Sequence, residues 1–206
     1  MTDHGHGHFD ERAATWDDDP EKVAGSRRVA DLVAAAVPLS PSTRLLEYGA
    51  GTGLLTQALG DRVGPVTLAD TSAGMREVMA RKVAAGDLPA DARVRDLDLS
   101  TESVPDERFD LVVTVLALHH IDDVDRVLRA FAALLDGGGH LCVADLEAGD
   151  GSFHGEGFHG HDGFDPDALA DRIRAAGFAE VRIDRDVLRI DRNGRQHPVF
   201  LAVART

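Results

Sequence analysis

Glu47-Tyr48-Gly49-Ala50-Gly51-Thr52-Gly53 is the stretch of sequence that decides the fold. It follows a short apolar segment at 44–48 that predicts a strand, and it leads into a helix predicted at 54–59. Three closely spaced glycines let the backbone turn tightly and approach a ligand. The first turn of the helix then presents free N–H groups to a polar or anionic ligand group. The stretch therefore predicts a ligand-binding strand–turn–helix unit.

A carboxylate at the end of the second predicted strand supports this interpretation. Asp70 lies nineteen residues beyond Gly51, directly after the strand predicted at 65–69. A carboxylate at this point accepts hydrogen bonds from ribose hydroxyls, an arrangement shared with dinucleotide-binding proteins. The dinucleotide fingerprint, however, requires a glycine where this sequence has Leu54. The glycines are instead spaced by two throughout, with an acidic residue two positions before the first.

Strands and helices alternate along the rest of the chain. Further strands are predicted at 92–97, 109–116 and 141–144, and further helices at 21–37, at 122–135 and from Asp165-Pro166 to Gly177. A helix also carries Met75, Val78, Met79 and Val83 on one face, with Thr71 or Ser72 as its cap and Gly86 as its end. We expect the glycines at 137–139 to end the helix before the fifth strand. Two last strands, at 181–190 and 199–203, form a hairpin around Asn193-Gly194, with Pro198 at a strand start.

This order of elements predicts an α/β fold: a doubly wound, seven-stranded, mostly parallel sheet with a C-terminal antiparallel hairpin and N-terminal helices. We expect one domain over 1–206. Within it, 1–8 form a flexible His-rich tail, 9–38 a helical cap, 40–146 a cofactor-binding core, and 147–206 an acceptor-side loop, helix and hairpin. Ligands of open α/β sheets bind beyond the carboxyl ends of the strands.

The Glu-x-Gly-x-Gly-x-Gly pattern at 47–53 resembles motif I of the class I S-adenosylmethionine-dependent methyltransferases. The resemblance implies a Rossmann-like fold with S-adenosylmethionine as cofactor. It assigns Glu47 to the methionine amino end, the loop glycines Gly49, Gly51 and Gly53 to the backbone cradle, and Asp70 to the ribose. Further residues expected beside the cofactor are Tyr48, Ala50, Thr71, Met75 and Leu116.

The resemblance continues after the third and fourth predicted strands. In this family an acid followed by an apolar residue reads the adenine, and either Asp98 with Leu99 or Asp96 with Leu97 fits that role here. The usual interval to the next strand favours Asp98 and Leu99. The segments at 109–113 and 117–121 resemble the family's fourth strand and the residues after it. The resemblance covers about residues 40–146, and the C-terminal part follows the family by architecture only.

Histidines are the candidate catalytic groups. A sulfonium methyl is already activated, so a methyltransferase chiefly orients its substrates, and a base is needed only where the acceptor must lose a proton. His119 and His120 follow the fourth strand, and His154, with His159 and His161, lies in the loop after the fifth. We take His119, His120 and His154 as catalytic candidates, while helix capping and a solvated loop remain alternatives. No metal is predicted, because these histidines have no fixed helical spacing and no cysteine supports a zinc site.

Composition limits the possible partners. The 206 residues carry a net charge of −14 and no cluster of Lys and Arg, which argues against nucleic acid and anionic membranes. No apolar stretch reaches the length of a membrane span, and the N-terminus is polar, so we expect a cytoplasmic protein. The single cysteine, Cys142, lies in an apolar run and is expected in the core. The oligomeric state stays open.

The functional expectation is methyl transfer to an unidentified small-molecule acceptor. One alternative is a non-catalytic S-adenosylmethionine-binding module that regulates a partner. Another is an NAD-dependent oxidoreductase, which Leu54 and the lack of a Tyr-x-x-x-Lys pair disfavour.

Overall fold

The computed structural model of the chain describes residues 6–155, 157–192 and 194–206. The chain divides into two compact units, Met1–Asp98 and Leu99–Thr206, which are described in turn. Among the described residues, none of the helices has the length and apolarity that crossing a bilayer would require.

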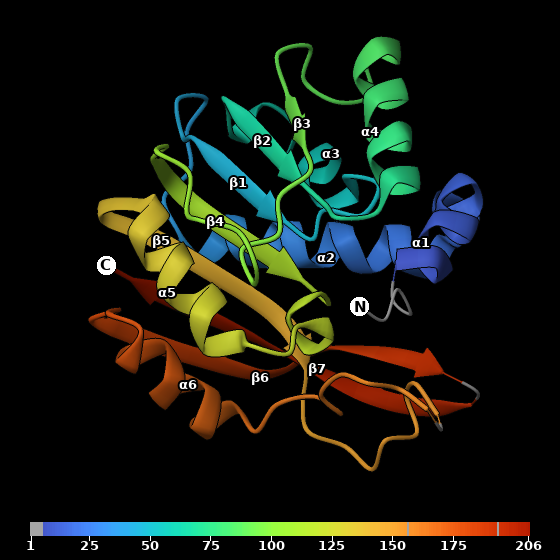
Figure 1. The fold of residues 1–206 in the computed structure, drawn as a ribbon, viewed down its shortest axis with the longest axis vertical. Coiled ribbons are helices and arrows are strands. Elements are labelled where there is room, and N and C mark those ends of the chain that lie inside the picture. Colours follow the sequence, from blue (N-terminus) through green and yellow to red (C-terminus); the bar gives the residue numbers. More distant parts are fainter. Residues whose placement is uncertain (1–5, 156, 193) are drawn as a thin grey trace. The chain divides into compact units, whose positions relative to one another are not determined.

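The first unit begins with helices (Figure 1). They are α1 (His6–Arg12), the 3-10 helix η1 (Ala13–Asp18) and α2 (Pro20–Ala36). Asp19 caps α2 by accepting a hydrogen bond from the Glu21 N–H, and Pro20 occupies the first helical position, where its missing N–H costs nothing. Because α1 begins at His6, the tail expected at 1–8 extends less far than predicted. His4 lies outside the described residues.

Three parallel strands form the sheet of the first unit, in the order β3-β2-β1. The elements follow as β1 (Leu45–Tyr48), α3 (Leu54–Leu59), η2 (Gly60–Arg62), β2 (Val66–Ala69), α4 (Ala73–Ala85) and β3 (Arg93–Arg95). Every residue of β1 and β2 is buried, as expected of parallel strands covered on both faces. Ser72 caps α4 by accepting from the Met75 N–H, and Gly86 ends it in a left-handed conformation.

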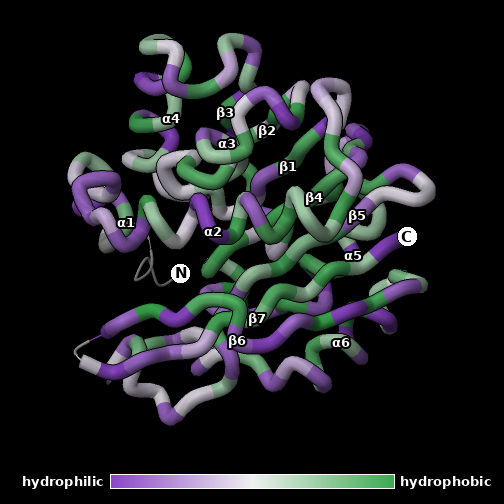
Figure 2. The backbone as a smooth tube through the Cα atoms, turned by 180° about the vertical axis from the view of Figure 1, so that it is seen from behind, coloured by the Kyte–Doolittle hydropathy of each residue, from purple (hydrophilic) through white to green (hydrophobic). Residues whose placement is uncertain are grey.

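Four further strands, in the order β4-β5-β7-β6, belong to the second unit, which gives a sheet of seven strands among the described residues. The elements are β4 (Phe109–Val115), η3 (Leu118–His120), α5 (Val124–Leu134), β5 (Leu135–Leu146), α6 (Pro166–Ala175), β6 (Glu180–Arg192) and β7 (Arg195–Arg205). β4 and β5 are parallel, and β7 is antiparallel to both β5 and β6. Figure 2 shows the contrast between the hydrophobic β4 and the hydrophilic stretches of β6, which is largely solvent-accessible.

Two expectations about this unit are wrong. The glycines at 137–139 do not separate α5 from the next strand. Instead α5 ends at Leu134, and β5 runs from Leu135 through the glycines, with an irregular register opposite Phe109. Pro198 lies inside β7 and not at its start. It is tolerated there because β7 pairs only with β6 up to this point, and pairing with β5 begins at Val199.

In its described residues, 147–155 and 157–165, the loop has no helix or strand of its own, as expected, apart from a bridge between Glu147 and Phe164. It is followed by α6, whose N-cap Asp165 accepts a hydrogen bond from the Ala168 N–H. Of the turn expected at Asn193-Gly194, Asn193 lies outside the described residues, and Gly194 has a positive φ of 74°. Cys142 is fully buried in β5, which confirms its place in the core.

Candidate active site

The glycine loop of the first unit lies between β1 and α3. Gly49, Gly51 and Gly53 have φ angles of 69°, 57° and 78°, a region that side chains disfavour. A Cβ at Gly53 would come within 3.1 Å of a Leu88 methyl group, so this glycine is required for packing. A Cβ at Gly51 would meet no described atom within 4 Å. The loop therefore presents Gly51 to open space, as a backbone cradle for a ligand requires.

Asp70 ties this loop to the end of β2. One carboxylate oxygen accepts a 2.8 Å hydrogen bond from the Gly51 N–H, and the other accepts a 2.9 Å bond from the Ser72 N–H. Asp70, the residue expected to bind the ribose, therefore also fixes the conformation of the glycine loop. Neighbouring Thr71 is half-buried.

Glu47 is buried in β1, with only 4% of its surface exposed. Its Oε2 accepts hydrogen bonds from both the N–H and the hydroxyl of Thr56 in α3. Burial raises the pKa of Glu47 to about 7, against the opposing effect of the two Thr56 bonds. The carboxyl group is thus poised to change charge near neutral pH when a cation such as an α-ammonium group approaches.

The other residues expected beside the cofactor differ in accessibility. Tyr48 and Ala50 are buried next to the loop, and Met75 is a fully buried core residue of α4. Asp96 is 62% exposed and ion-paired with Arg76 at 2.9 Å, whereas Asp98 is half-buried and Leu99 is buried. Leu97 is also buried, and the preference for Asp98 and Leu99 stays a prediction.

The N-terminal helices of the first unit bond directly to the loop and to the start of α4. Thr52 donates to Asp17, which also pairs with Lys82. Asp10 of α1 accepts from the Ser72 hydroxyl and, at 2.9 Å, from the Gly74 N–H. The segment expected to form a cap is therefore anchored to the glycine loop by acidic side chains.

In the second unit, strain and a buried histidine follow β4. Leu116 has a φ of 51°, rare for a residue with a side chain, and such strain is common at functional sites. His119 is 1% exposed, and its Nδ1 lies 2.6 Å from Oδ1 of the fully buried Asp145. The same carboxylate accepts the backbone N–H groups of His119 and Leu146. Because a carboxylate accepts hydrogen bonds, Nδ1 of His119 is the donor in this pair.

His120 and His154 lie against His119. Ring centroids are 4.1 Å apart for His119 and His120, and 5.0 Å apart for His119 and His154. Phe158 stacks on His154 at 3.7 Å. Burial, together with the nearby His119, lowers the pKa of His154 to about 4, so its imidazole is neutral at pH 7. The structure thus brings together the three histidines that the sequence analysis selected as catalytic candidates.

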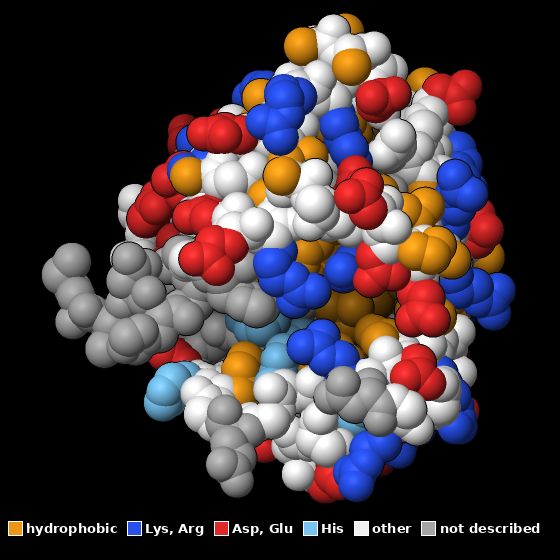
Figure 3. All heavy atoms as spheres, turned by 90° about the vertical axis from the view of Figure 1, so that its right-hand side faces the viewer, with side chains coloured by type: hydrophobic (Ala, Val, Ile, Leu, Met, Phe, Trp, Pro, Cys, Tyr) orange, Lys and Arg blue, Asp and Glu red, His pale blue; other side chains and the backbone are white. Residues whose placement is uncertain are grey.

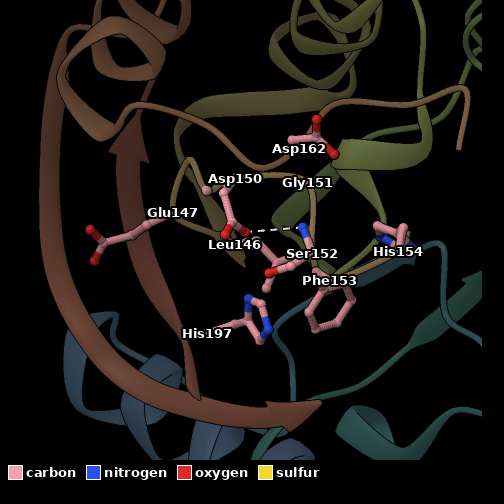
Figure 4. A pocket seen from close by; sticks show the side chains of 10 residues that line it. Leu146, Glu147, Asp150, Gly151, Ser152, Phe153, His154, Asp162 and His197 are labelled. Atoms are coloured by element: carbon pink, nitrogen blue, oxygen red, sulfur yellow. Dashed lines mark hydrogen bonds between the residues drawn. The ribbon is translucent and has the colours of Figure 1, made fainter. Parts of the chain in front are cut away.

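A hollow of about 260 Å³, counted with its solvent-open space, adjoins this histidine cluster, defined as His119, His120 and His154. In Figure 4, His154, Phe153 and His197 surround it together with the turn in which Ser152 donates to Asp150, while the Glu147 carboxylate points away. Several histidine side chains also reach the surface on the face shown in Figure 3. The hollow offers apolar rings and polar groups of the kind that small-molecule sites combine.

The comparisons with known proteins decide the family. A family model described as a methyltransferase domain matches residues 21–183. The chain belongs to the class I S-adenosylmethionine-dependent methyltransferases. Its cofactor is therefore S-adenosylmethionine, as expected, and the alternative of an NAD-dependent oxidoreductase is wrong.

Individual relatives agree with this assignment. An uncharacterized methyltransferase of Schizosaccharomyces pombe is 29% identical over 154 residues, covering 68% of this chain and 54% of that protein. A ubiquinone biosynthesis O-methyltransferase of Xanthomonas campestris is 31% identical over 141 residues, covering 67% and 58%. This methyltransferase thus spans about half the length of these curated relatives.

Solved structures confirm the fold class. A Haloferax volcanii methyltransferase, solved in complex with the Trm112 methyltransferase activator, matches with a TM-score of 0.76 at 19% identity, covering 96% of both chains. This likeness supports the Rossmann-like methyltransferase fold with its antiparallel C-terminal hairpin.

Several residues beside the histidine cluster were not among the candidates selected from the sequence. Asp145 directly follows the strand expected at 141–144, so the rule that ligands bind beyond strand ends could have found it. Phe153, Phe158 and His197 come together only through the loop and β7, and no sequence spacing indicates this. Of the other loop histidines, His161 bonds the Ile121 carbonyl, and His159 is exposed.

Proposed function

We propose that this methyltransferase transfers the methyl group of S-adenosylmethionine to a small-molecule acceptor. The single observation that carries the proposal is the glycine loop, whose open side at Gly51 is held in place by the Asp70 carboxylate. In this assignment the glycine loop and Asp70 bind the cofactor, and the histidine cluster with its adjoining hollow binds the acceptor.

Each cofactor residue has a role suited to its environment. Glu47, Gly49 and Gly53 shape the side of the loop that receives the methionine moiety. Because burial raises the pKa of Glu47 to about 7, a nearby ammonium group would favour loss of its proton and pair with the resulting carboxylate. Asp70 accepts from the ribose hydroxyls. Asp98 and Leu99 contact the adenine. The residues that border these contacts are Tyr48, Ala50, Thr71, Met75 and Leu116.

The features of the second unit favour a small acceptor. The hollow combines apolar and polar lining groups, and the net charge of −14 disfavours nucleic acid. His119, His120 and His154 are the groups that would position the acceptor atom. From the loop at 147–165, Phe153 supplies an apolar wall of the hollow, and Phe158 stacks on the His154 ring.

The test is incubation with methyl-labelled S-adenosylmethionine and a panel of phenols, carboxylic acids, amines and thiols, with RNA and protein substrates in parallel. We expect label in a small molecule, and none after Asp70→Ala, which removes both the loop brace and the ribose contact. Labelling of RNA or protein alone would contradict a small acceptor. Cofactor binding without any transfer would favour the non-catalytic module.

A further inference from the structure

Three imidazoles gather in the second unit in a way that methyl transfer by itself does not require. His119, His120 and His154 each offer a ring nitrogen, and these three atoms lie within 4.8 Å of one another. His119 comes from η3 after β4, and His154 comes from the long loop after β5. Since the cluster forms only when the loop folds over η3, the spacing of the three histidines in the sequence does not indicate that they lie together.

Two of these imidazoles have a buried nitrogen that is not hydrogen-bonded within the described part of the chain. These are Nε2 of His119, on a side chain that is 99% buried, and Nε2 of His154. A buried polar atom without a hydrogen-bond partner is unfavourable, because it has lost its bonds to water without replacing them. A bound group would satisfy such an atom. Imidazole nitrogen is a ligand well suited to divalent transition metals such as Zn²⁺.

The surroundings of His119 match those of a metal ligand. Its Nδ1–H donates to the buried Asp145, which fixes the tautomer and leaves Nε2 available as a ligand atom. Metal-bound histidines almost always donate their second nitrogen in this way, to a carboxylate or a carbonyl. His161 adds a second restraint, since its N–H donates at 2.8 Å to the His119 carbonyl.

The loop residues also suit a metal site. Phe158 stacks on the His154 ring, and Phe153 packs against its edge, so both shield the cluster from water. Asp145 and Asp162 place negative charge near His154, which offsets part of the charge of a dication. Nitrogen ligands of a tetrahedral ion with 2.0–2.1 Å bonds lie about 3.4 Å apart. The three imidazole nitrogens lie within 4.8 Å of one another, so they would have to draw closer by little more than 1 Å at most to reach that spacing.

We propose that His119, His120 and His154 bind one divalent transition-metal ion of the zinc type, with Asp145 orienting His119. Three protein ligands leave a fourth position open, as in catalytic zinc sites. In the methyltransferase, that position takes the oxygen, nitrogen or sulfur atom of the acceptor. This last role rests on the proposed function, whereas the binding of the metal does not. The proposal departs from the expectation of no metal.

The test uses the full chain with His4→Ala, His6→Ala and His8→Ala, since the N-terminal histidines would bind metal themselves. Zn²⁺ binding is followed by calorimetry, Co²⁺ binding by the visible absorption of a tetrahedral complex, and Mg²⁺ serves as the oxygen-preferring comparison. We expect one Zn²⁺ or Co²⁺ per chain and no binding of Mg²⁺.

Variants in this background locate the site. His154→Ala should weaken Co²⁺ binding at least about tenfold, and Asp145→Asn about 10- to 100-fold. His140→Ala, on β5 outside the cluster, should leave it unchanged. Thermal unfolding without metal identifies any variant that fails to fold. If Asp145→Asn fails to fold, the result for His154→Ala decides whether the metal site exists, because His154 lies outside helices and strands. A background protein that binds no Co²⁺, or binds it equally after His154→Ala, overturns the proposal.

S-adenosylhomocysteine binding is measured in the same samples. Cofactor binding without metal binding would overturn only this inference. Metal binding without cofactor binding would overturn the proposed function and leave the metal site standing.

Discussion

The carboxyl group of Glu47 couples the stability of the fold to pH. Its pKa is about 7 in the folded protein, against an ordinary value of 4.5, because burial disfavours its charged form. The folded state therefore holds more protons than the unfolded state between these two values. The free energy of unfolding must fall as the pH rises through this window and must then level off.

We expect this loss to amount to about 3 kcal/mol in the free protein. Glu47→Gln keeps an oxygen for the Thr56 bonds and has no proton to lose, so its free energy of unfolding should not show this decline. Urea unfolding of both proteins at intervals from pH 4.5 to 8 measures the difference. If the free energies of unfolding of the two proteins changed in parallel with pH, Glu47 would not titrate in this range.

The open side of Gly51 can be tested separately from its backbone conformation. Gly51→Ala and Gly86→Ala both place a Cβ at a positive φ, of 57° and 83°, with no described atom within 4 Å. Both should lose about 1–2 kcal/mol of stability through backbone strain. Only Gly51→Ala should also weaken S-adenosylhomocysteine binding, by tenfold or more, in calorimetry. Equal affinities of the two variants would mean that the ligand does not approach Gly51.

At the scale of elements, the contact between α1 and the start of α4 leaves no room for a side chain. A Cβ at Gly74 would lie 2.9 Å from both the Cα and the carbonyl oxygen of Asp10. Since these are backbone atoms, Gly74→Ala must push α1 away and break the bonds of Asp10 to Ser72 and Gly74. We expect a loss of about 1–3 kcal/mol and faster proteolysis before α2.

Gly7→Ala is the matched control within the same pair of helices. Its Cβ would meet no described atom, so the substitution should stabilise α1 slightly through helix propensity. Limited proteolysis of both variants, followed by mass spectrometry, locates the cleavage. If Gly74→Ala were cut no faster than Gly7→Ala, α1 would not depend on this contact.

The elements that could be predicted are those with local signals. The bounds of α3 agree with the prediction, and Ser72, Gly86 and Asp165 take the capping roles that their residue types indicate. The ends of β5 and β7 could not be predicted in this way. The glycines at 137–139 and Pro198 are residue types that normally interrupt a strand. Here the pairing with neighbouring strands outweighs their low intrinsic strand propensity.

The same distinction holds for the site. The glycine loop and Asp70 follow from a short motif, because both lie at strand ends within one β–α–β unit. The histidine cluster depends on how the loop at 147–165 folds back onto η3. That contact joins residues more than 30 positions apart, which no local pattern encodes.

At the scale of the whole molecule, charge limits the choice of partners. The net charge is −14, and Figure 3 shows Lys and Arg interspersed with Asp and Glu on the face that it presents. Phosphate backbones need clustered cations. We expect no retardation of duplex DNA or of RNA in gel-shift assays at 0.1 M salt, and a stable complex would contradict the assignment of a small acceptor.

Calorimetry with S-adenosylhomocysteine, and with NAD in parallel, tests the central claim most directly. We expect S-adenosylhomocysteine to bind one to one and NAD not to bind, and we expect Asp70→Ala to abolish S-adenosylhomocysteine binding whereas His120→Ala spares it. Binding of NAD alone, or unchanged affinity in Asp70→Ala, would contradict this claim.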